Sequence, residues 1–264
     1  MKHNYCRNIK YERIAITEEK LYISKLKSEF GDKGSFTKSD LIEFYTDLTS
    51  DISQSLIDWR VLSLSKKGIL ERIGHGIYTF GKEKKFKPYL QDAHKKLFKD
   101  LDEKLPYAEK CIWRTSILNQ FMIHQPGHFM TIIEIDREAK ESAFYFLKDR
   151  GLEVFLEMDI DFIWRYSSID KETVIVKALI TEAPLQSVEE VQTVTLEKVL
   201  VDLFCDTDLF TTYQGTERST IFKEAFIKYT ININKLLRYA GRRGKRGDIR
   251  EYLERLDLIP FKKK

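Results

Sequence analysis

Three carboxylates at alternating positions are the first residues whose spacing could do chemistry. Glu157, Asp159 and Asp161 are separated by single residues, so on a β-strand they would share one face. Such a set can hold Mg²⁺ for phosphoryl or nucleotidyl transfer. A nucleotidyltransferase also needs a Gly-Ser turn shortly before the acidic pair, and a nuclease core needs a strand with Glu-x-Lys. The sequence has no such turn, and Lys177 lacks the matching acid, so we interpret the three carboxylates as a solvated strand or loop.

His124 and His128 have the i, i+4 spacing that brings two metal ligands together on a helix. Pro126 and Gly127 interrupt any helical turn between them, and no cysteine is near in sequence. Gly-rich phosphate loops and the Gly-x-Ser-x-Gly turn of hydrolases are also missing. We therefore predict no catalytic residue, no metal site and no cofactor, and an enzyme using the acids near Asp159 is the least favoured alternative.

A basic segment near the C-terminus is either an ordinary solvated face or a contact surface for an acidic partner. Its residues are Lys235, Arg238, Arg242, Arg243, Lys245, Arg246 and Arg250, and Lys262, Lys263 and Lys264 follow further on. The candidates for contact with a protein partner or the DNA backbone are Arg238, Arg242, Arg243, Lys245 and Arg246.

The segment from Thr17 to Gly81 has the pattern of a winged helix-turn-helix. Apolar residues recur at helical spacing in three consecutive segments: Leu21, Ile23, Leu26 and Phe30; Leu41, Phe44, Tyr45 and Leu48; Ile57, Val61 and Leu64. Thr37 stands three residues before Asp40, as in a capping box. Gly68 is placed to end the third helix in the left-handed conformation. Two strands follow, over 69–73 and 77–80, and Gly74-His75-Gly76 joins them with glycines that allow a tight hairpin.

This pattern predicts binding to double-stranded operator DNA, with the third helix (residues 53–67) in the major groove. The candidate DNA contacts are Ser55, Trp59, Arg60, Ser63, Lys66 and Lys67 on the helix and Arg72 and His75 on the hairpin. Trp59 and Leu62 share a face away from the core, so a protein-docking role is an alternative. Asp58 on the same helix would repel phosphate.

A charged break at residues 82–88 separates this segment from a region with longer strands and helices. We predict helices at 89–105, 116–123, 138–150, 196–205, 217–228, 233–240 and 248–256, and strands at 110–113, 128–135, 153–156 and 173–180. The predicted fold class is α+β: a winged helix-turn-helix in residues 1–81, then a mixed α/β domain with a helical C-terminal bundle in residues 82–264.

Two motifs resemble those of AbiEi-type antitoxins. The run from Leu70 to Tyr78 (LERIGHGIY) resembles the wing of that family. The run from Thr195 to Leu203 (TLEKVLVDL) resembles its second-domain signature, in which a threonine or serine precedes a charged pair, an apolar run and an aspartate. The resemblance implies a transcriptional repressor of its own operon whose second domain counters a nucleotidyltransferase-like toxin encoded next to it. From the residues alone, we expect Asp202 to cap or salt-bridge a neighbouring helix, for example through Arg218.

The composition is compatible with this function. The 264 residues include 45 basic and 41 acidic residues, which permits contact with nucleic acid without demanding it. Charges interrupt every apolar run before 18 residues, and no apolar region follows the first charged residues, so we expect neither a membrane span nor a secretory signal. Cys6, Cys111 and Cys205 are scattered, as in cytosolic proteins without disulfides.

The favoured function is therefore a cytoplasmic, non-enzymatic DNA-binding repressor and antitoxin. The next alternative is a stand-alone DNA-binding regulator whose second domain senses a ligand.

Overall fold

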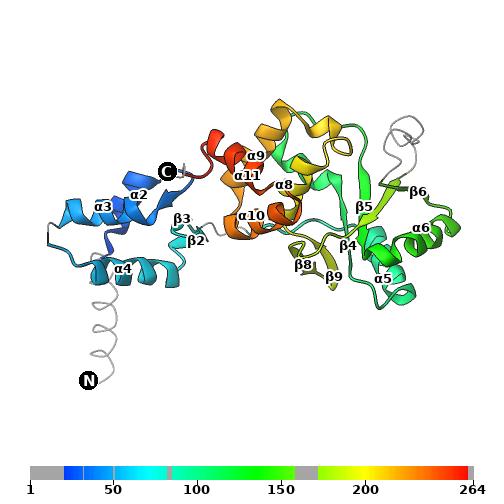
Figure 1. The fold of residues 1–264 in the computed structure, drawn as a ribbon, viewed down its shortest axis with the longest axis horizontal. Coiled ribbons are helices and arrows are strands. Elements are labelled where there is room, and N and C mark those ends of the chain that lie inside the picture. Colours follow the sequence, from blue (N-terminus) through cyan, green and yellow to red (C-terminus); the bar gives the residue numbers. More distant parts are fainter. Residues whose placement is uncertain (1–20, 32, 50, 82–84, 158–171, 261–264) are drawn as a thin grey trace, which may run out of the picture. The chain divides into compact units, whose positions relative to one another are not determined.

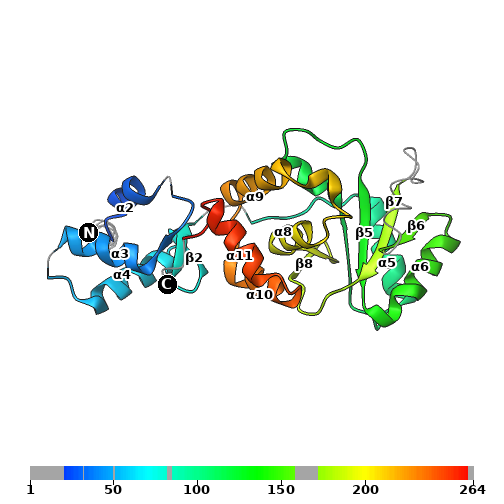
Figure 2. The same cartoon turned by 45° about the horizontal axis from the view of Figure 1, so that its top comes forward.

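The computed structural model describes residues 21–260, except residues 32, 50, 82–84 and 158–171. Contacts divide the chain into two compact units, one of Met1–Glu83 together with Asp257–Lys264 and one of Lys84–Leu256. The described part is a mixed α/β protein with three small sheets (Figures 1 and 2). None of its helices is long and apolar enough to cross a lipid bilayer.

In its described residues, the first unit contains three helices and a small antiparallel sheet. In chain order its elements are α2 (Ile23–Phe30), β1 (Phe36–Thr37), α3 (Lys38–Leu48), α4 (Gln54–Lys66), β2 (Leu70–Gly74) and β3 (Ile77–Phe80). The strand order is β1-β3-β2, so the hairpin of β2 and β3 is extended by β1. The helices α2, α3 and α4 and the strands β2 and β3 agree with the elements predicted from the sequence.

Local signals fix the ends of these elements. Asp40 N donates to Thr37 Oγ1 over 3.1 Å and Thr37 N donates to Asp40 Oδ2 over 2.6 Å, which confirms the predicted capping box at the start of α3. Gly68 has φ +70°, which confirms its left-handed conformation after α4. In the hairpin turn Gly76 has φ +66°, whereas a register shift between β2 and β3 accommodates Gly74.

The core of the first unit is apolar and also takes residues from the far end of the chain. Tyr45 is fully buried and its hydroxyl donates to Leu21 O over 3.0 Å. Leu258 and Ile259 are buried, and Ser35 Oγ donates to Leu258 O over 3.3 Å. Sequence analysis placed everything after residue 81 in one domain, but the segment from Asp257 belongs to the first unit. An apolar pair has no periodicity from which its packing partner could be deduced.

A four-stranded sheet organises the second unit. Its order is β4-β5-β7-β6, with β4 (Lys110–Arg114) antiparallel to β5 (Met130–Ile135), and with β7 (Thr173–Ala178) parallel to both β5 and β6 (Glu153–Leu156). One face of the sheet packs against α5 (Asp92–Lys104) and α6 (Lys140–Asp149). Phe98 and Leu147 from these helices share a core cluster with Ile133 and Val176 from the sheet.

The opposite face is covered by the helices of the C-terminal half, with α8 nearest to the strands (Figure 2). These helices are α8 (Leu196–Cys205), α9 (Thr216–Lys228), α10 (Ile233–Arg242) and α11 (Arg246–Arg255). Among the described residues, short 3₁₀ turns lie at Thr115–Phe121, Arg137–Ala139 and Thr211–Tyr213. The predicted helix at 116–123 is the first of these 3₁₀ turns.

Sequence analysis missed one hairpin, β8 (Leu185–Val188) and β9 (Val191–Val194). Its turn consists of Glu189 and Glu190, which have φ values of 49° and 67°. Two glutamates in the left-handed region are unusual, since turn residues of this kind are normally Gly, Asn or Asp. The turn therefore carries none of the usual sequence signals.

Candidate functional site

The exposed side of α4 is the first candidate site. Ser55, Trp59, Leu62 and Lys66 follow one another at spacings of four, three and four residues, which places them along one line of the helix at about 100° per residue. Trp59 is 46% exposed and Leu62 is 54% exposed, so two large apolar side chains occupy the middle of this line. Ser55 and Lys66 are exposed at its two ends, so the line is polar near the N-terminus of α4 and basic near its C-terminus.

Two further predicted contacts belong to the same helix end. Lys67 is exposed at the C-cap of α4, whereas Ser63 is half-buried beside the central line. We call Ser55, Leu56, Trp59, Leu62, Ser63, Lys66 and Lys67 the α4 face.

Arg60 does not belong to this face, which corrects its prediction as a DNA contact. It is only 7% exposed, and its guanidinium lies 5.1 Å from the ring centroid of Tyr22 and 4.9 Å from that of Tyr45. Stacking on aromatic rings offsets part of the cost of burying the charge. A charged residue one position before the core residue Val61 was interpreted as outward-facing, but the two tyrosines that cover it come from distant segments.

Lys38 contacts both α4 and the hairpin turn. Its Nζ lies 2.8 Å from Asp58 Oδ1, and its backbone N–H donates to Gly76 O over 2.8 Å. The hydrogen bonds from Lys38 and Gln54 lower the pKa of Asp58. The carboxylate that was expected to repel phosphate is therefore paired with a cation. Sequence analysis did not single out Lys38, because its partner lies on another helix.

The hairpin turn carries the two predicted contacts Arg72 and His75. Arg72 Nε donates to Gly74 O over 3.1 Å, and Arg72 Nη2 lies 3.3 Å from His75 Nδ1. Both residues are exposed. The bond to Gly74 holds the guanidinium beside the turn, so the turn and Lys38 together form a basic margin next to α4.

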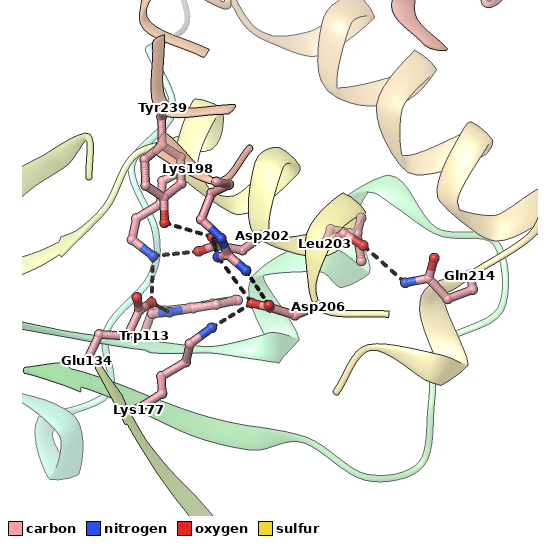
Figure 3. A network of polar contacts seen from close by, with 10 residues as sticks. Trp113, Glu134, Lys177, Lys198, Asp202, Leu203, Asp206, Gln214 and Tyr239 are labelled. Atoms are coloured by element: carbon pink, nitrogen blue, oxygen red, sulfur yellow. Dashed lines mark hydrogen bonds and ion pairs between the residues drawn. The ribbon is translucent and has the colours of Figure 1, made fainter. Parts of the chain in front are cut away.

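A buried network of charges in the second unit is the second candidate site (Figure 3). Lys198 on α8 is fully buried, and its Nζ lies 2.6 Å from Glu134 Oε1 and 2.5 Å from Asp202 Oδ2. Trp113 Nε1 also donates to Glu134 Oε1, over 3.1 Å. Tyr239 on α10 donates its hydroxyl to Asp202 Oδ1 over 2.8 Å. The contacts join β4, β5, α8 and α10.

The network continues towards the surface through three more charges. Lys177 on β7 lies beside Glu134 in the sheet register, and its Nζ donates to Asp206 Oδ2 over 2.6 Å. Arg243, just after α10, donates to Asp202 Oδ1 over 2.8 Å and also pairs with Asp206. The network thus holds three carboxylates and three cations and is formally neutral.

The electrostatics of the network favour a structural role. Burial alone would lower the pKa of Lys198, but the charges of Asp202 and Glu134 outweigh it and raise the pKa well above its ordinary value. For Glu134 the directions are reversed: burial alone would raise its pKa, but the charges of Lys198 and Lys177 bring the pKa below its usual range. A lysine held protonated between two carboxylates is neither a base nor a nucleophile. The expected structural role of Asp202 fits this geometry, but its partners are Lys198, Tyr239 and Arg243.

Arg218, the partner first expected for Asp202, has a different environment. Its Nη1 donates to Gln214 Oε1 over 2.9 Å, and its guanidinium lies over the rings of Phe204 and Tyr252. It therefore packs among the C-terminal helices without reaching the network.

The basic C-terminal residues are mostly paired within the second unit. Arg243 is 14% exposed and engaged by two carboxylates, which corrects its prediction as a partner contact. Arg238 and Arg242 both pair with Glu182, and Lys245 pairs with Asp248 over 2.8 Å. Arg246 is exposed at the start of α11. The exposed pairs are screened by water and leave these side chains accessible to a partner.

Comparison with protein families finds a match over residues 56–258. The chain belongs to the Family of unknown function (DUF6577). The DUF6577 match begins within α4 and covers the hairpin, the four-stranded sheet and all members of the buried network. No curated protein matches the chain significantly.

The remaining residues singled out in the sequence do not form a catalytic group in the described part of the DUF6577 chain. Glu157 Oε1 lies 3.3 Å from Lys140 Nζ, and His128 Nε2 lies 3.1 Å from Thr173 Oγ1. Asp159 and Asp161 fall outside the described residues. Within those residues, no three His, Cys, Asp or Glu side chains gather as metal ligands would.

A polar cluster that sequence analysis missed lies at the start of β7. Glu172 Oε1 is 2.9 Å from Nε2 of the buried His94 and 3.4 Å from Arg114 Nε, and it accepts a hydrogen bond from Thr131 Oγ1 over 2.5 Å. His94 contributes most to lowering the pKa of Glu172 to about 2, against the opposing effect of burial. The cluster ties α5 to three strands.

We expect Lys198→Met to destabilise the second unit by about 3–5 kcal/mol, since it removes the cation between Glu134 and Asp202 and leaves the buried network with one uncompensated negative charge. Urea unfolding at neutral pH measures this loss. The matched control Lys245→Met breaks an exposed pair that water screens, so it should leave the urea midpoint nearly unchanged. An equal, small effect of both substitutions would contradict the assigned role of the network.

Glu172 gives a pH dependence whose sign is fixed by its lowered pKa. A carboxyl with a pKa of about 2 in the folded state and an ordinary value of 4.5 stabilises the fold above pH 4.5, and this contribution is lost as the pH falls towards 2. Glu172→Gln should therefore lower the urea midpoint at pH 6 and differ less from the wild type at pH 3. The control Glu251→Gln changes an exposed carboxylate on α11 and should leave the profile unaltered. The same difference at both pH values would refute the prediction.

Proposed function

We propose that this protein is a cytoplasmic transcriptional regulator whose first unit binds double-stranded operator DNA as a winged helix-turn-helix. The order of three helices and a hairpin supports this proposal, because a winged helix has a helix for the major groove followed by a wing of two strands. In this assignment α4 enters the groove and the turn between β2 and β3 is the tip of the wing.

The observation that carries the proposal is the basic margin beside α4, together with the two lysines at the end of the α4 face. Lys38, Arg72 and His75 lie on the side of the hairpin turn, and Lys66 and Lys67 lie at the C-terminal end of the helix. Phosphate contacts from such residues fix the position of a protein on the duplex. The pairing of Asp58 with Lys38 lessens the repulsion of phosphate at this surface.

The DNA-binding half of the proposal is tested with the full chain and two duplexes, one of its own upstream region and one of random sequence. We expect affinity to fall steeply with salt, because bound phosphates release counterions. Lys66→Ala should weaken binding to both duplexes alike and reduce the slope of log K against log salt by about one.

The control for this measurement is Lys223→Ala on α9 in the second unit, which should leave the slope unchanged. Failure of the wild-type chain to bind upstream DNA in a salt-sensitive way would overturn the DNA-binding half.

We propose further that the second unit counters a nucleotidyltransferase-like toxin, as the resemblance to AbiEi-type antitoxins implies. The motif from Thr195 to Leu203 that carries this resemblance corresponds to α8, which supplies Lys198 and Asp202 to the network. All residues of the motif are buried, so it builds the interior of the unit. Contact with a toxin must then come from exposed residues, among which Arg238, Arg242 and Arg246 are the candidates.

Co-expression tests the antitoxin half. If the neighbouring gene encodes such a toxin, the full chain should restore growth, and the combined variant Arg238→Ala, Arg242→Ala and Arg246→Ala should restore it less well. Lys223→Ala should protect as well as the wild type. Unrelieved toxicity with a folded, expressed wild-type chain would reject this half and leave DNA binding untouched.

Ligand sensing has weaker support. A cavity of about 180 Å³ is lined by Glu157, Lys177, Cys205, Asp206, Thr207, Asp208 and Leu209. Its volume is below the roughly 300–1,000 Å³ of pockets that hold small molecules. We therefore do not assign a ligand to the second unit.

A further inference from the structure

The α4 face has an uncommon composition for a helix in the major groove. Leu56, Trp59 and Leu62 are large, apolar and between 41% and 54% exposed, and Trp59 and Leu62 occupy the middle of the face. Exposed apolar side chains clustered on one face usually mark a contact surface.

Side chains that read guanine are missing from the middle of this face. Guanine is read chiefly by arginine or lysine, which donate to its O6 and N7 atoms. The one arginine of α4, Arg60, is buried under Tyr22 and Tyr45. The helix has its lysine, Lys66, in the last turn, and the next residue, Lys67, is the C-cap.

The polar residues near the start of α4 are also engaged. Asp58, which could accept from cytosine, is paired with Lys38, and Gln54 Nε2 donates to Asp58 Oδ1 over 3.2 Å. The accessible groups that remain along the centre of the helix are a serine hydroxyl at Ser55 and the side chains of Trp59 and Leu62.

Thymine offers the complementary group, because its 5-methyl is the apolar feature that a base pair presents in the major groove. The charges around the face suit a duplex as well. Lys38 and Arg72 lie on one side and Lys66 and Lys67 at the C-terminal end, so cations border an apolar strip as phosphates border a groove floor. A protein partner would need an apolar patch with an acidic rim to fit this face.

We propose that the α4 face recognises the 5-methyl groups of thymine in the major groove, with Trp59 and Leu62 as the residues that determine specificity. This inference rests on the proposed DNA binding and narrows it to sites with thymines under the middle of α4, where Trp59 and Leu62 lie. Affinity then comes from the basic margin, and sequence preference comes from apolar contact.

The test begins with selection of duplexes from a random pool by the full chain. The selected duplex is then made again with uracil in place of every thymine, which removes the methyl groups and keeps the base pairing. We expect thymine-containing sites to be enriched, and the uracil duplex to bind about tenfold more weakly at constant salt.

Two variants show whether the α4 face is responsible. Trp59→Ala should bring the affinities for the thymine and uracil duplexes within about twofold of each other, while the salt slope stays that of the wild type. The control Tyr145→Ala removes an exposed aromatic side chain from α6 and should keep the preference for thymine. Thermal unfolding of each variant verifies that it is folded.

Two results would overturn the inference while the proposed DNA binding stands. One is equal binding of thymine and uracil duplexes by the wild type. The other is a thymine preference that Trp59→Ala leaves unchanged, which would show that the α4 face does not recognise the methyl groups. Absence of salt-sensitive binding to any duplex would instead reject the proposed function and the inference with it.

Discussion

The ammonium group of Lys198 lies between two buried carboxylates, and the second unit is arranged around this contact. An isolated charge in a protein interior costs several kcal/mol, so Lys198 requires Glu134 from the sheet and Asp202 from its own helix at the same time. This requirement fixes both the rotation of α8 and its height above β5. Tyr239 and Arg243 both donate to Asp202, so the same network also fixes the position of α10.

Such a network confers specificity of packing more than net stability. Apolar residues of similar volume often stabilise a core as much as a buried ion pair does, but they tolerate small rotations of a helix. Six charges that must all be paired tolerate far less. In this protein the charged residues of the motif from Thr195 to Leu203 are part of the interior.

Local patterns in the sequence were sufficient for most of the fold. The capping box of Thr37 and Asp40 and the left-handed Gly68 depend on neighbours within a few residues, and both were predicted. The four strands of the main sheet were recognisable as apolar runs. The hairpin of β8 and β9 was not, because Glu189 and Glu190 adopt positive φ without a glycine or asparagine signal.

The candidate sites were predictable only in part, because charged side chains were assigned to the surface by default. Arg60 is buried under two tyrosine rings, and Arg243 is largely covered and paired with Asp202 and Asp206; in both cases the partners lie far away in the sequence. Lys38 was overlooked for the same reason, since Asp58 is 20 positions away. Long-range pairing of charges leaves no periodic trace in a single sequence.

The first unit is built from two separate parts of the chain, and this affects the order in which its parts are made on the ribosome. Because the segment from Asp257 belongs with Met1–Glu83, the second unit is an insertion between two parts of the first. A ribosome makes α2, α3, α4 and the hairpin early, but Leu258 and Ile259 emerge only after the sheet and the helical layer of the second unit. The unit that we propose to bind DNA is therefore completed last, so an unfinished chain lacks part of that unit's core.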